Sequence, residues 1–589
     1  WVPCAFMEAL RPGGRVLLHS LAMEELNGAV GHLQTFHEDR GRWAVKVGPS
    51  APKLLKPANL KAIDAIDAIV PSIPSITAEI LGEDIFLRIC HFLPAGSVTA
   101  TSNCSCNVHK QLKESVSLWQ SLCYSLLDDA VITLHLAASD SGVHADQSAE
   151  FWRTLFRAGY KPIAFYYEHS LRKRCLHSSE CFQQSIIQSN GYSATSESPG
   201  ISERLEHLDS AVYFEKRQKI LGASGHTASA LKDFVVVIGG WRPWSLGTDL
   251  HVAVLDLLNM KLSEPPLASE SYQPMRRLRH SSCTVRRGGS PCILVLGGCN
   301  DKSHDPCDGL QTLLFLELLQ GGKPGKPDSH TVGHGDGSDT SLEINWRKVS
   351  ATGPVPQAIW HHAADSFAGG QKVVVFGGDI PARDPEFTFI GDRAYANYVY
   401  ILDIDSQQWE RVQTQGQIPH WRSLHFGATF SSNTTAEHFV IMGGCDEHLE
   451  IFQGGRPAVM VGYSLNLKTL SWKRGAERRK GKPLFVPAPR MRFGAQRYGR
   501  HLLVYGGHGT EAIPEEEELL VLNTTNLEWQ FAQIANQASE FGVAPAAALA
   551  GGCVLGGVEL GPRGAHPVPK LDFICLNPFG GQPGLSLLD

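Results

Sequence analysis

Six short apolar runs, each closed by a pair of glycines, mark the second half of the chain. The runs are rich in β-branched residues and lack a helical period, which predicts buried β-strands. Glycines at the end of a strand allow a close backbone approach and a bend that other residues resist. Each pair is followed by a polar loop and a second strand-like run, so the chain repeats one β-unit. The pairs begin at Gly239, Gly297, Gly377, Gly443, Gly506 and, in the weakest copy, Gly556.

The units share further features. Four continue into a strand-like segment with a tryptophan, "INWRKV", "QQWERV", "LSWKRG" and "LEWQFA", and three open on a basic stretch, "RRLRHSS", "WRSLHFG" and "PAPRMRFG". In this order they resemble kelch repeats, in which four strands form a blade and the blades pack in a ring. The resemblance implies a six-bladed kelch β-propeller over residues 210–578.

The last unit ends after "CLNPFG" without a tryptophan strand. A ring that lacked this strand would leave a sheet edge open. We therefore expect residues 211–217, within "SAVYFEKRQ", to pair as the outer strand of the blade that contains "LDFICLNP".

A short amphipathic segment, "EILGEDIFLRICHFLP", lies upstream of the repeats. Its apolar residues recur at helical spacing and Pro94 ends the pattern, which predicts a small helical element. Together with "SLWQSLC" it resembles an F-box over residues 77–125, although Gly82 replaces the family's usual proline and His109 its usual aromatic residue. F-boxes dock onto the adaptor of SCF-type cullin–RING ubiquitin ligases, and a helical spacer is the alternative interpretation. By the resemblance, the adaptor-facing or core residues are Leu81, Ile85, Ile89, Leu93, Pro94, Leu118 and Trp119.

The other segments complete a multidomain, mainly β architecture. Residues 10–61 alternate strand-like pieces with tight-turn signals and resemble a small β-barrel module of algal multidomain proteins. Residues 62–76 form a linker. Residues 126–209 form a helical extension, with "AEFWRTLFRAGY" as an amphipathic helix, and a serine-rich loop. The expected fold is thus a kelch propeller preceded by an α-helical F-box and an N-terminal barrel.

Composition narrows the function classes. With 43% hydrophobic residues, 19% charged residues and a net charge of −6, the chain is typical of a globular protein and lacks the basicity of a nucleic-acid binder. No apolar run approaches the roughly 20 residues of a membrane-spanning helix. The 14 cysteines are scattered, which suits the cytoplasm or nucleus, and neither tight cysteine group supplies paired zinc ligands, so we expect no metal or cofactor. The chain opens on Trp1, which leaves an upstream targeting peptide open.

In a kelch blade, the loop that opens each repeat and the loop after each glycine pair emerge on the same face. Arginines and aromatic residues in these loops suit an acidic or phosphorylated segment of a target protein, through charge-assisted hydrogen bonds and stacking. Asp379, after a glycine pair, would neutralise part of the patch. The candidate target-binding residues are Trp241, Arg242, Trp244, Arg276, Arg277, Arg279, His361, Trp421, Arg422, Arg490 and Arg492.

Three of these arginines also fit a structural role. Arg277, Arg422 and Arg490 match the arginine of the kelch repeat itself. Bracing of neighbouring blades is therefore the alternative interpretation for these three residues.

The combination predicts a non-catalytic, substrate-recognition subunit of an SCF-type ligase. The F-box binds the adaptor and, through it, the cullin, while the propeller binds the target protein. Some kelch propellers are enzymes, but no H-E-x-x-H, G-x-S-x-G or E-x-x-x-D-x-x-x-H motif occurs here. His361 and His362 are adjacent, but the first matches the repeat's own histidine. A metal-assisted kelch enzyme and a non-ligase interaction scaffold are the alternatives.

Overall fold

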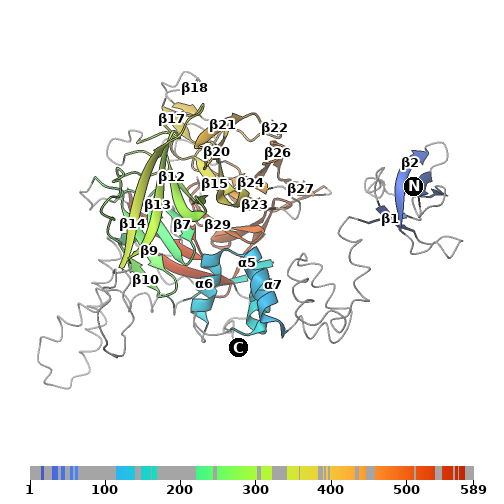
Figure 1. Ribbon diagram of the computed structural model, residues 1–589, viewed down its shortest axis with the longest axis horizontal. Coiled ribbons are helices and arrows are strands. Elements are labelled where there is room, and N and C mark those ends of the chain that lie inside the picture. The colour runs from blue at the N-terminus through green and yellow to red at the C-terminus, as the bar shows by residue number, and fades with distance from the viewer. Residues whose placement is uncertain are drawn as a thin grey trace, which may run out of the picture. The chain divides into compact units, whose positions relative to one another are not determined.

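The structure is a computed structural model that divides into two compact units, Trp1–Leu122 and Cys123–Asp589, each described by itself (Figure 1). Between residues 15 and 63 it describes five strands. Residues 114–171 are described apart from 140–146, 161, 163 and 169–170. Residues 220–576 are described apart from 243–247, 301–306, 322–340, 357, 382–388, 391–392, 396–397, 432–436, 446–457, 480, 510–512, 537–546, 562–563 and 568–569.

Six antiparallel sheets of four strands form the blades of a propeller (Figure 1). In each blade the second strand ends at a glycine pair. In order from first to fourth strand, blade one consists of β7 (Thr227–Leu231), β8 (Phe234–Ile238), β9 (Val252–Asp256) and β10 (Lys261–Ser263), and blade two of β11 (Ser281–Arg287), β12 (Ser290–Leu296), β13 (Thr312–Gly321) and β14 (Ser341–Ser350). Blade three consists of β15 (Ala363–Phe367), β16 (Lys372–Phe376), β20 (Val399–Asp403) and β21 (Gln408–Val412), and blade four of β23 (Phe426–Ser431), β24 (Glu437–Met442), β25 (Tyr463–Asn466) and β26 (Ser471–Arg474). Blade five consists of β29 (Gly494–Tyr498), β30 (His501–Tyr505), β31 (Leu519–Asn523) and β32 (Glu528–Phe531), and blade six of β34 (Ala548–Ala550), β35 (Cys553–Leu555), β38 (Leu571–Leu576) and β6 (Ala164–Tyr167). The kelch architecture predicted from the repeats is confirmed.

Short accessory elements decorate the blades. β22 (Gln415–Gly416) pairs in parallel with β26, and β33 (Gln533–Ile534) pairs in parallel with β6, so the outer edges of these two blades are covered. The remaining small elements are β17 (Asp379–Pro381), β18 (Phe389–Ile390), β19 (Arg393–Tyr395), β27 (Arg478–Arg479), β28 (Lys482–Pro483), β36 (Val558–Gly561), β37 (Gly564–Pro567) and the 3-10 turns η5 (Ala368–Gly370) and η7 (Glu515–Glu517).

Apolar side chains between consecutive blades form the core. The second strands are nearly continuous apolar runs because each blade packs on both faces. Each tryptophan of the repeat is buried on a fourth strand and packs against the preceding blade; these residues are Trp346, Trp409, Trp472 and Trp529. Two of the indoles also donate to a carbonyl of that blade: Trp409 to Leu310 at 2.8 Å, and Trp529 to Met460. The tryptophans therefore bind each blade to the one before it.

The ring closes with a strand from far upstream, but not the one predicted. β6 pairs antiparallel with β38, in the register Ile574 opposite Tyr167 and Leu576 opposite Phe165. The expectation that residues 211–217 pair with this strand is wrong, because β6 occupies that edge. Residues 211–217 themselves lie outside the described part of the chain. The propeller thus includes residues that the sequence assigned to a helical extension.

Helices carry the chain into this closing strand. The predicted helix at "AEFWRTLFRAGY" is confirmed as α7 (Ala149–Tyr160), and it is preceded by α6 (Asp129–Ala138). His135 of α6 is fully buried; its Nδ1–H donates to the carbonyl of Val131 at 2.7 Å, and its Nε2 accepts from the backbone N–H of Leu576 at 2.8 Å. Thr133 donates to Asp233, in the first turn of the first blade, at 2.7 Å. α6 therefore clamps the last blade to the first.

The N-terminal unit contains an antiparallel sheet in the order β4-β3-β2-β1-β5. Its strands are β1 (Arg15–Leu18), β2 (Val30–His37), β3 (Arg42–Lys46), β4 (Lys53–Leu55) and β5 (Leu60–Ile63). Closure of this sheet into a barrel stays a prediction. So does the F-box, because Leu81, Ile85, Ile89, Leu93 and Pro94 lie outside the described residues.

The remaining two residues assigned to the F-box lie on α5 (Val116–Leu126). Leu118 is fully buried and Trp119 is half-buried. Their contact with an adaptor stays a prediction.

Candidate functional site

One backbone position recurs around the axis of the propeller, just before the first strand of each of the first five blades. Its residues all have positive φ, between 52° and 69°, which is uncommon for residues other than glycine. Four backbone hydrogen bonds join them: from the second blade to the fifth, the N–H donates to the carbonyl of its counterpart in the preceding blade, at 2.8–3.5 Å. This ring of bonds compensates for the unfavourable backbone conformation. The ring residues are Gly225, Arg279, His361, Leu424 and Arg492.

The ring surrounds a cavity of about 590 Å³ on the axis. The first residues of the first strands of all six blades contribute to its walls, and Trp241 joins them from the first glycine-pair loop. Among the candidate target-binding residues, the structure therefore brings together Trp241, Arg279, His361 and Arg492. The cavity combines these two cationic side chains with aromatic residues and five histidines.

At the first three glycine pairs, histidines pack against both glycines. A Cβ on Gly377 would lie 2.6 Å from the Cε1 of His425 in the next blade and 2.5 Å from the carbonyl oxygen of Arg422. A Cβ on Gly378 would lie 2.8 Å from the Cβ of His362 in its own blade. Neither position has room for a side chain, so glycine is required at both.

The same packing recurs between the last blade and the first, where the Cε1 of His226 would lie 2.7 Å from a Cβ on Gly556. It also corrects the register of the third repeat. His362 fills the repeat's histidine position, like His280 and His425, whereas His361 is the ring residue. Assignment of the structural role to His361 is wrong.

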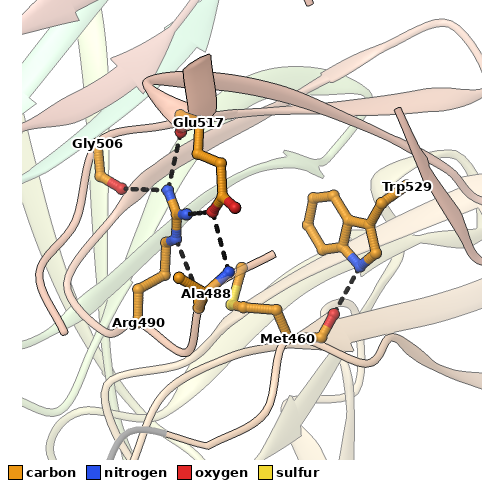
Figure 2. Close-up of polar contacts among 6 residues, drawn as sticks. All are labelled: Met460, Ala488, Arg490, Gly506, Glu517 and Trp529. Carbon is orange, nitrogen blue, oxygen red and sulfur yellow. Dashed lines mark hydrogen bonds and ion pairs between the residues drawn. The ribbon is translucent and has the colours of Figure 1, made fainter. Parts of the chain in front are cut away.

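The repeat arginines lie beneath the surface. Figure 2 shows Arg490, whose side chain is fully buried. Its guanidinium donates to the carbonyls of Ala488 at 3.2 Å, Gly506 at 3.3 Å and Glu517 at 2.9 Å, and it forms an ion pair with the Glu517 carboxylate. That carboxylate also accepts from the N–H of Ala488 at 2.9 Å. Arg490 thus ties the repeat-opening loop to the glycine-pair loop of its own blade.

Arg277 and Arg422 repeat this arrangement. Arg277 donates to the carbonyl of Gly297 at 2.9 Å and pairs with Asp308 at 2.9 Å, and Arg422 donates to the carbonyl of Gly443 at 3.1 Å. We therefore correct the assignment of Arg277, Arg422 and Arg490 to the target surface: they brace the loops, as the alternative interpretation held. The bracing acts within a blade rather than between blades.

The other candidates do not line the cavity either. Arg242 and Arg276 are buried, and their guanidinium groups donate to the carbonyls of Ile220 at 2.7 Å and of Arg242 at 2.8 Å. Trp421 is half-buried beside the ring of His420. Trp244 lies outside the described residues. Burial removes Arg242 and Arg276 from the candidate surface.

His361 has a carboxylate partner at the edge of the cavity. Its Nδ1 lies 2.8 Å from Oδ2 of Asp379, the residue after the third glycine pair. Burial, together with the charges of Arg279 and Arg492, lowers the pKa of His361 to about 4 despite the opposing effect of Asp379. The imidazole is therefore neutral at pH 7.

Buried neutral histidines make the propeller sensitive to acid. Burial lowers the pKa of His135 and His226 to about 4 and that of His362 to about 3, whereas an unfolded histidine titrates near 6.5. The unfolded state therefore binds more protons below pH 6.5, and stability that is fully present above that pH is lost as the pH falls towards 4. We expect the free energy of unfolding to fall by about 1.4 kcal/mol per pH unit for each histidine within this window.

Urea denaturation at pH 7.5, 6.0 and 5.0 measures the effect. His135→Gln, which removes one titrating group, is expected to reduce the slope by about one proton. Equal unfolding free energies at pH 7.5 and 5.0 would contradict the expectation.

The described residues add two negative findings. No group of three His, Cys, Asp or Glu side chains among them is arranged to hold a metal ion. None of the helices in that part of the chain combines the length and apolarity needed to cross a membrane.

Comparison with known proteins agrees with the fold. The KLHDC2/KLHL20/DRC7 Kelch-repeats domain matches residues 225–450 and again 392–561, which together span more than half of the chain. Acyl-CoA-binding domain-containing proteins 4 and 5 of Arabidopsis thaliana are 24% identical over 306 residues and 26% identical over 308 residues. These regions are 52% of this chain but only 37% and 38% of the relatives, so the chain covers well under half of their length. On the family match and the six blades, the chain belongs to the KLHDC2/KLHL20/DRC7 kelch-repeats domain family.

Proposed function

We propose that the chain is a non-catalytic substrate-recognition subunit of an SCF-type ubiquitin ligase. A kelch propeller suits a protein-interaction role, and the cavity on its axis is the part that suits target binding. The observation that carries the target-binding part of this proposal is the placement of the arginines: Arg277, Arg422 and Arg490 brace the loops, and Arg279 and Arg492 line the cavity.

The cavity chemistry favours an acidic or phosphorylated segment of a protein. Arg279 and Arg492 are half-buried, so an anion bound between them would be only partly screened by water. Guanidinium groups bind carboxylates and phosphates through charge-assisted hydrogen bonds, and Trp241 offers an apolar wall for the rest of the segment.

The link to the ligase rests on the F-box resemblance of residues 77–125. In this proposal the F-box binds the adaptor, and ubiquitin transfer is performed by other subunits. The chain would then contribute by holding the target at a high effective concentration near the ligase.

A co-purification experiment with the full chain separates the two halves of the proposal. Arg279→Glu/Arg492→Glu is expected to lose at least about tenfold of captured target while retaining adaptor, because it reverses the charge that contacts the anion. Ile89→Asp is expected to lose the adaptor while retaining the target, because a desolvated charge at an interface centre costs several kcal/mol. Quantitative mass spectrometry of the bound proteins measures both effects.

Lys473→Glu/Arg478→Glu is the matched control, since it makes the same charge change at two exposed residues outside the cavity. Target capture that survives the Arg279/Arg492 reversal would show that the cavity is not the site. Target capture without any adaptor, in the native chain, would instead support a non-ligase scaffold.

A further inference from the structure

The outer edge of the fourth strand is covered in blades two, three, four and six. In each of them the connector that leads into the blade bonds to backbone groups of that strand which point out of the sheet. The bonds run from the N–H of Tyr272 to the carbonyl of Trp346 at 2.9 Å, from Trp409 to Thr352 at 2.8 Å, from Gln417 to Trp472 at 3.0 Å and from Ala535 to Phe165 at 3.0 Å. These connectors therefore close edges that would otherwise be free to pair with another chain.

Blade five differs, because its connector folds into the hairpin of β27 and β28 at the edge of the propeller (Figure 1). The hairpin lies beside β32, the outermost strand of the blade, through side chains: Arg479 pairs with Glu528 at 3.3 Å, and the ring of Phe485 stacks on that of Phe531 with centroids 4.0 Å apart. Among the described residues of this connector, none forms a backbone hydrogen bond with β32. The edge of blade five is thus open where four other blades are closed.

The ladder shows which backbone groups this edge presents. The N–H of Ala532 donates to the carbonyl of Leu519 at 3.3 Å, which fixes the phase of the pairing between β31 and β32. Residues of an antiparallel strand alternate between those that bond to the partner strand and those that point away, so the N–H and carbonyl groups of Trp529 and Phe531 point away from β31. Trp472 has the same place in blade four, where the connector covers it. Phe531 is 45% exposed, so this end of the edge is accessible.

The charge beside the edge narrows what can pair with it. Residues 473–482, which include the hairpin, contain six basic residues and one acidic residue, in a chain of net charge −6. A second copy of the chain would bring the same positive charge to its own edge, so self-pairing is disfavoured, whereas an acidic segment is attracted. Nucleic acid would also be attracted, but it cannot continue a β-ladder. The open backbone groups therefore favour a polypeptide.

We propose that the outer edge of β32 binds an extended acidic segment of a partner protein by strand addition. The segment takes the place that connectors occupy in the other blades, and the exposed ring of Phe531 offers an apolar contact for alternate side chains. None of the residues of β32 lines the cavity on the axis. The inference is therefore independent of the proposed function.

A simple peptide tests the edge with the native full chain. The probe is a labelled peptide of about eight residues that alternates glutamate with valine, and the comparison peptide has lysine in place of glutamate. We expect saturable binding of the glutamate peptide, at least about tenfold tighter than that of the lysine peptide, because of the excess positive charge beside the edge. Fluorescence anisotropy at about 0.15 M salt measures both affinities. Equal affinities, or no saturable binding of the glutamate peptide, would overturn the proposal.

Two substitutions at one residue test the backbone bonds. Phe531→Ala and Phe531→Pro both remove the ring, but only proline also removes the outward N–H, which the ladder with β31 does not use. We expect proline to weaken binding of the glutamate peptide about tenfold relative to alanine, because a backbone carbonyl of the peptide then lacks its donor. Thermal unfolding monitors the stability of both variants. Similar affinities of two folded variants would contradict strand addition.

Amide hydrogen exchange provides a readout that needs no substitution. In the native chain, the glutamate peptide is expected to slow exchange at Phe531, whose N–H points outward, and to leave Gln530, whose N–H faces β31, unchanged. Unchanged exchange at Phe531 in the saturated complex would overturn the proposal.

Further variants separate the edge from the cavity and from other occupants. Arg279→Glu/Arg492→Glu is expected to retain the glutamate peptide, and Phe531→Pro is expected to retain target capture. If the cavity variant loses the peptide and Phe531→Pro does not, the peptide binds in the cavity and the edge proposal fails. A dimer of the purified chain that Phe531→Pro dissociates would also overturn the proposal, because it would assign the edge to a second copy. Size-exclusion chromatography of both proteins measures this.

Discussion

A chain that lacks residues 1–168 is expected to lose a closed propeller, whereas a chain that lacks only residues 1–112 is expected to keep it. The difference between the two truncations is α5, α6, α7 and β6. Without β6, β38 becomes an open edge, and the apolar contacts of Phe165 and Tyr167, both at most 2% exposed, are lost. Without α6, the clamp between the last and first blades is lost as well.

Soluble yield, thermal unfolding and size-exclusion chromatography measure this outcome. We expect the shorter chain to aggregate and to unfold without a cooperative transition, while the longer chain behaves as the intact propeller does. Phe165→Ala, in the full chain, is a milder version of the same test and should cost about 3–5 kcal/mol. Equal solubility and equal melting temperature of the two truncations would contradict closure by β6.

Arg490→Met is expected to destabilise the propeller by about 3–5 kcal/mol, whereas Arg492→Met is expected to cost less than about 1 kcal/mol. Removal of Arg490 leaves the buried Glu517 carboxylate without its ion-pair partner and three carbonyls without a donor. Arg492 is half-buried at the cavity, so methionine can replace its packing and water can compensate for its charge. Two arginines in one tripeptide, "RMR", thus have opposite roles.

Urea denaturation of both variants measures the difference in unfolding free energy. Target capture is measured on the same variants, to separate a loss of binding from a loss of stability. Arg492→Met should weaken capture at nearly native stability. Adding Glu517→Gln to Arg490→Met should restore part of the lost stability, because the unpaired buried charge is then removed. Similar losses of stability in the Arg490 and Arg492 variants would argue against the bracing role.

The sequence left two interpretations of Arg277, Arg422 and Arg490 open, target binding and bracing, and only the structure decided between them. Arg490 and Arg492 lie in the same repeat-opening loop, so both were expected on the target-binding face. The positive φ of Arg492, 52°, turns the chain between them, and the ring of hydrogen bonds that holds this conformation joins residues from five different blades. The same hydrogen bonds run through His361 rather than His362.

For Asp379, the sequence predicted the position of the residue but not the contact that it makes. The sequence placed it on the target-binding face because it follows a glycine pair, and the structure brings its carboxylate to His361. Its effect is more specific than partial neutralisation of the patch, because the carboxylate sets the protonated nitrogen of the ring. That role depends on a 2.8 Å contact between two loops, which spacing alone does not encode.

The sequence by itself determined the repeated blade, since buried strands, glycine pairs and strand tryptophans are local patterns whose physical causes act within one blade or between neighbours. It also indicated that an upstream segment closes the ring, because the last unit lacks a fourth strand. Both residues 211–217 and residues 164–167 contain aromatic residues that suit an outer strand, so the sequence did not distinguish them. Only the tertiary structure decided that the strand is β6, because β6 pairs with β38. It also decided which arginines are buried, because burial depends on contacts between residues far apart in the chain.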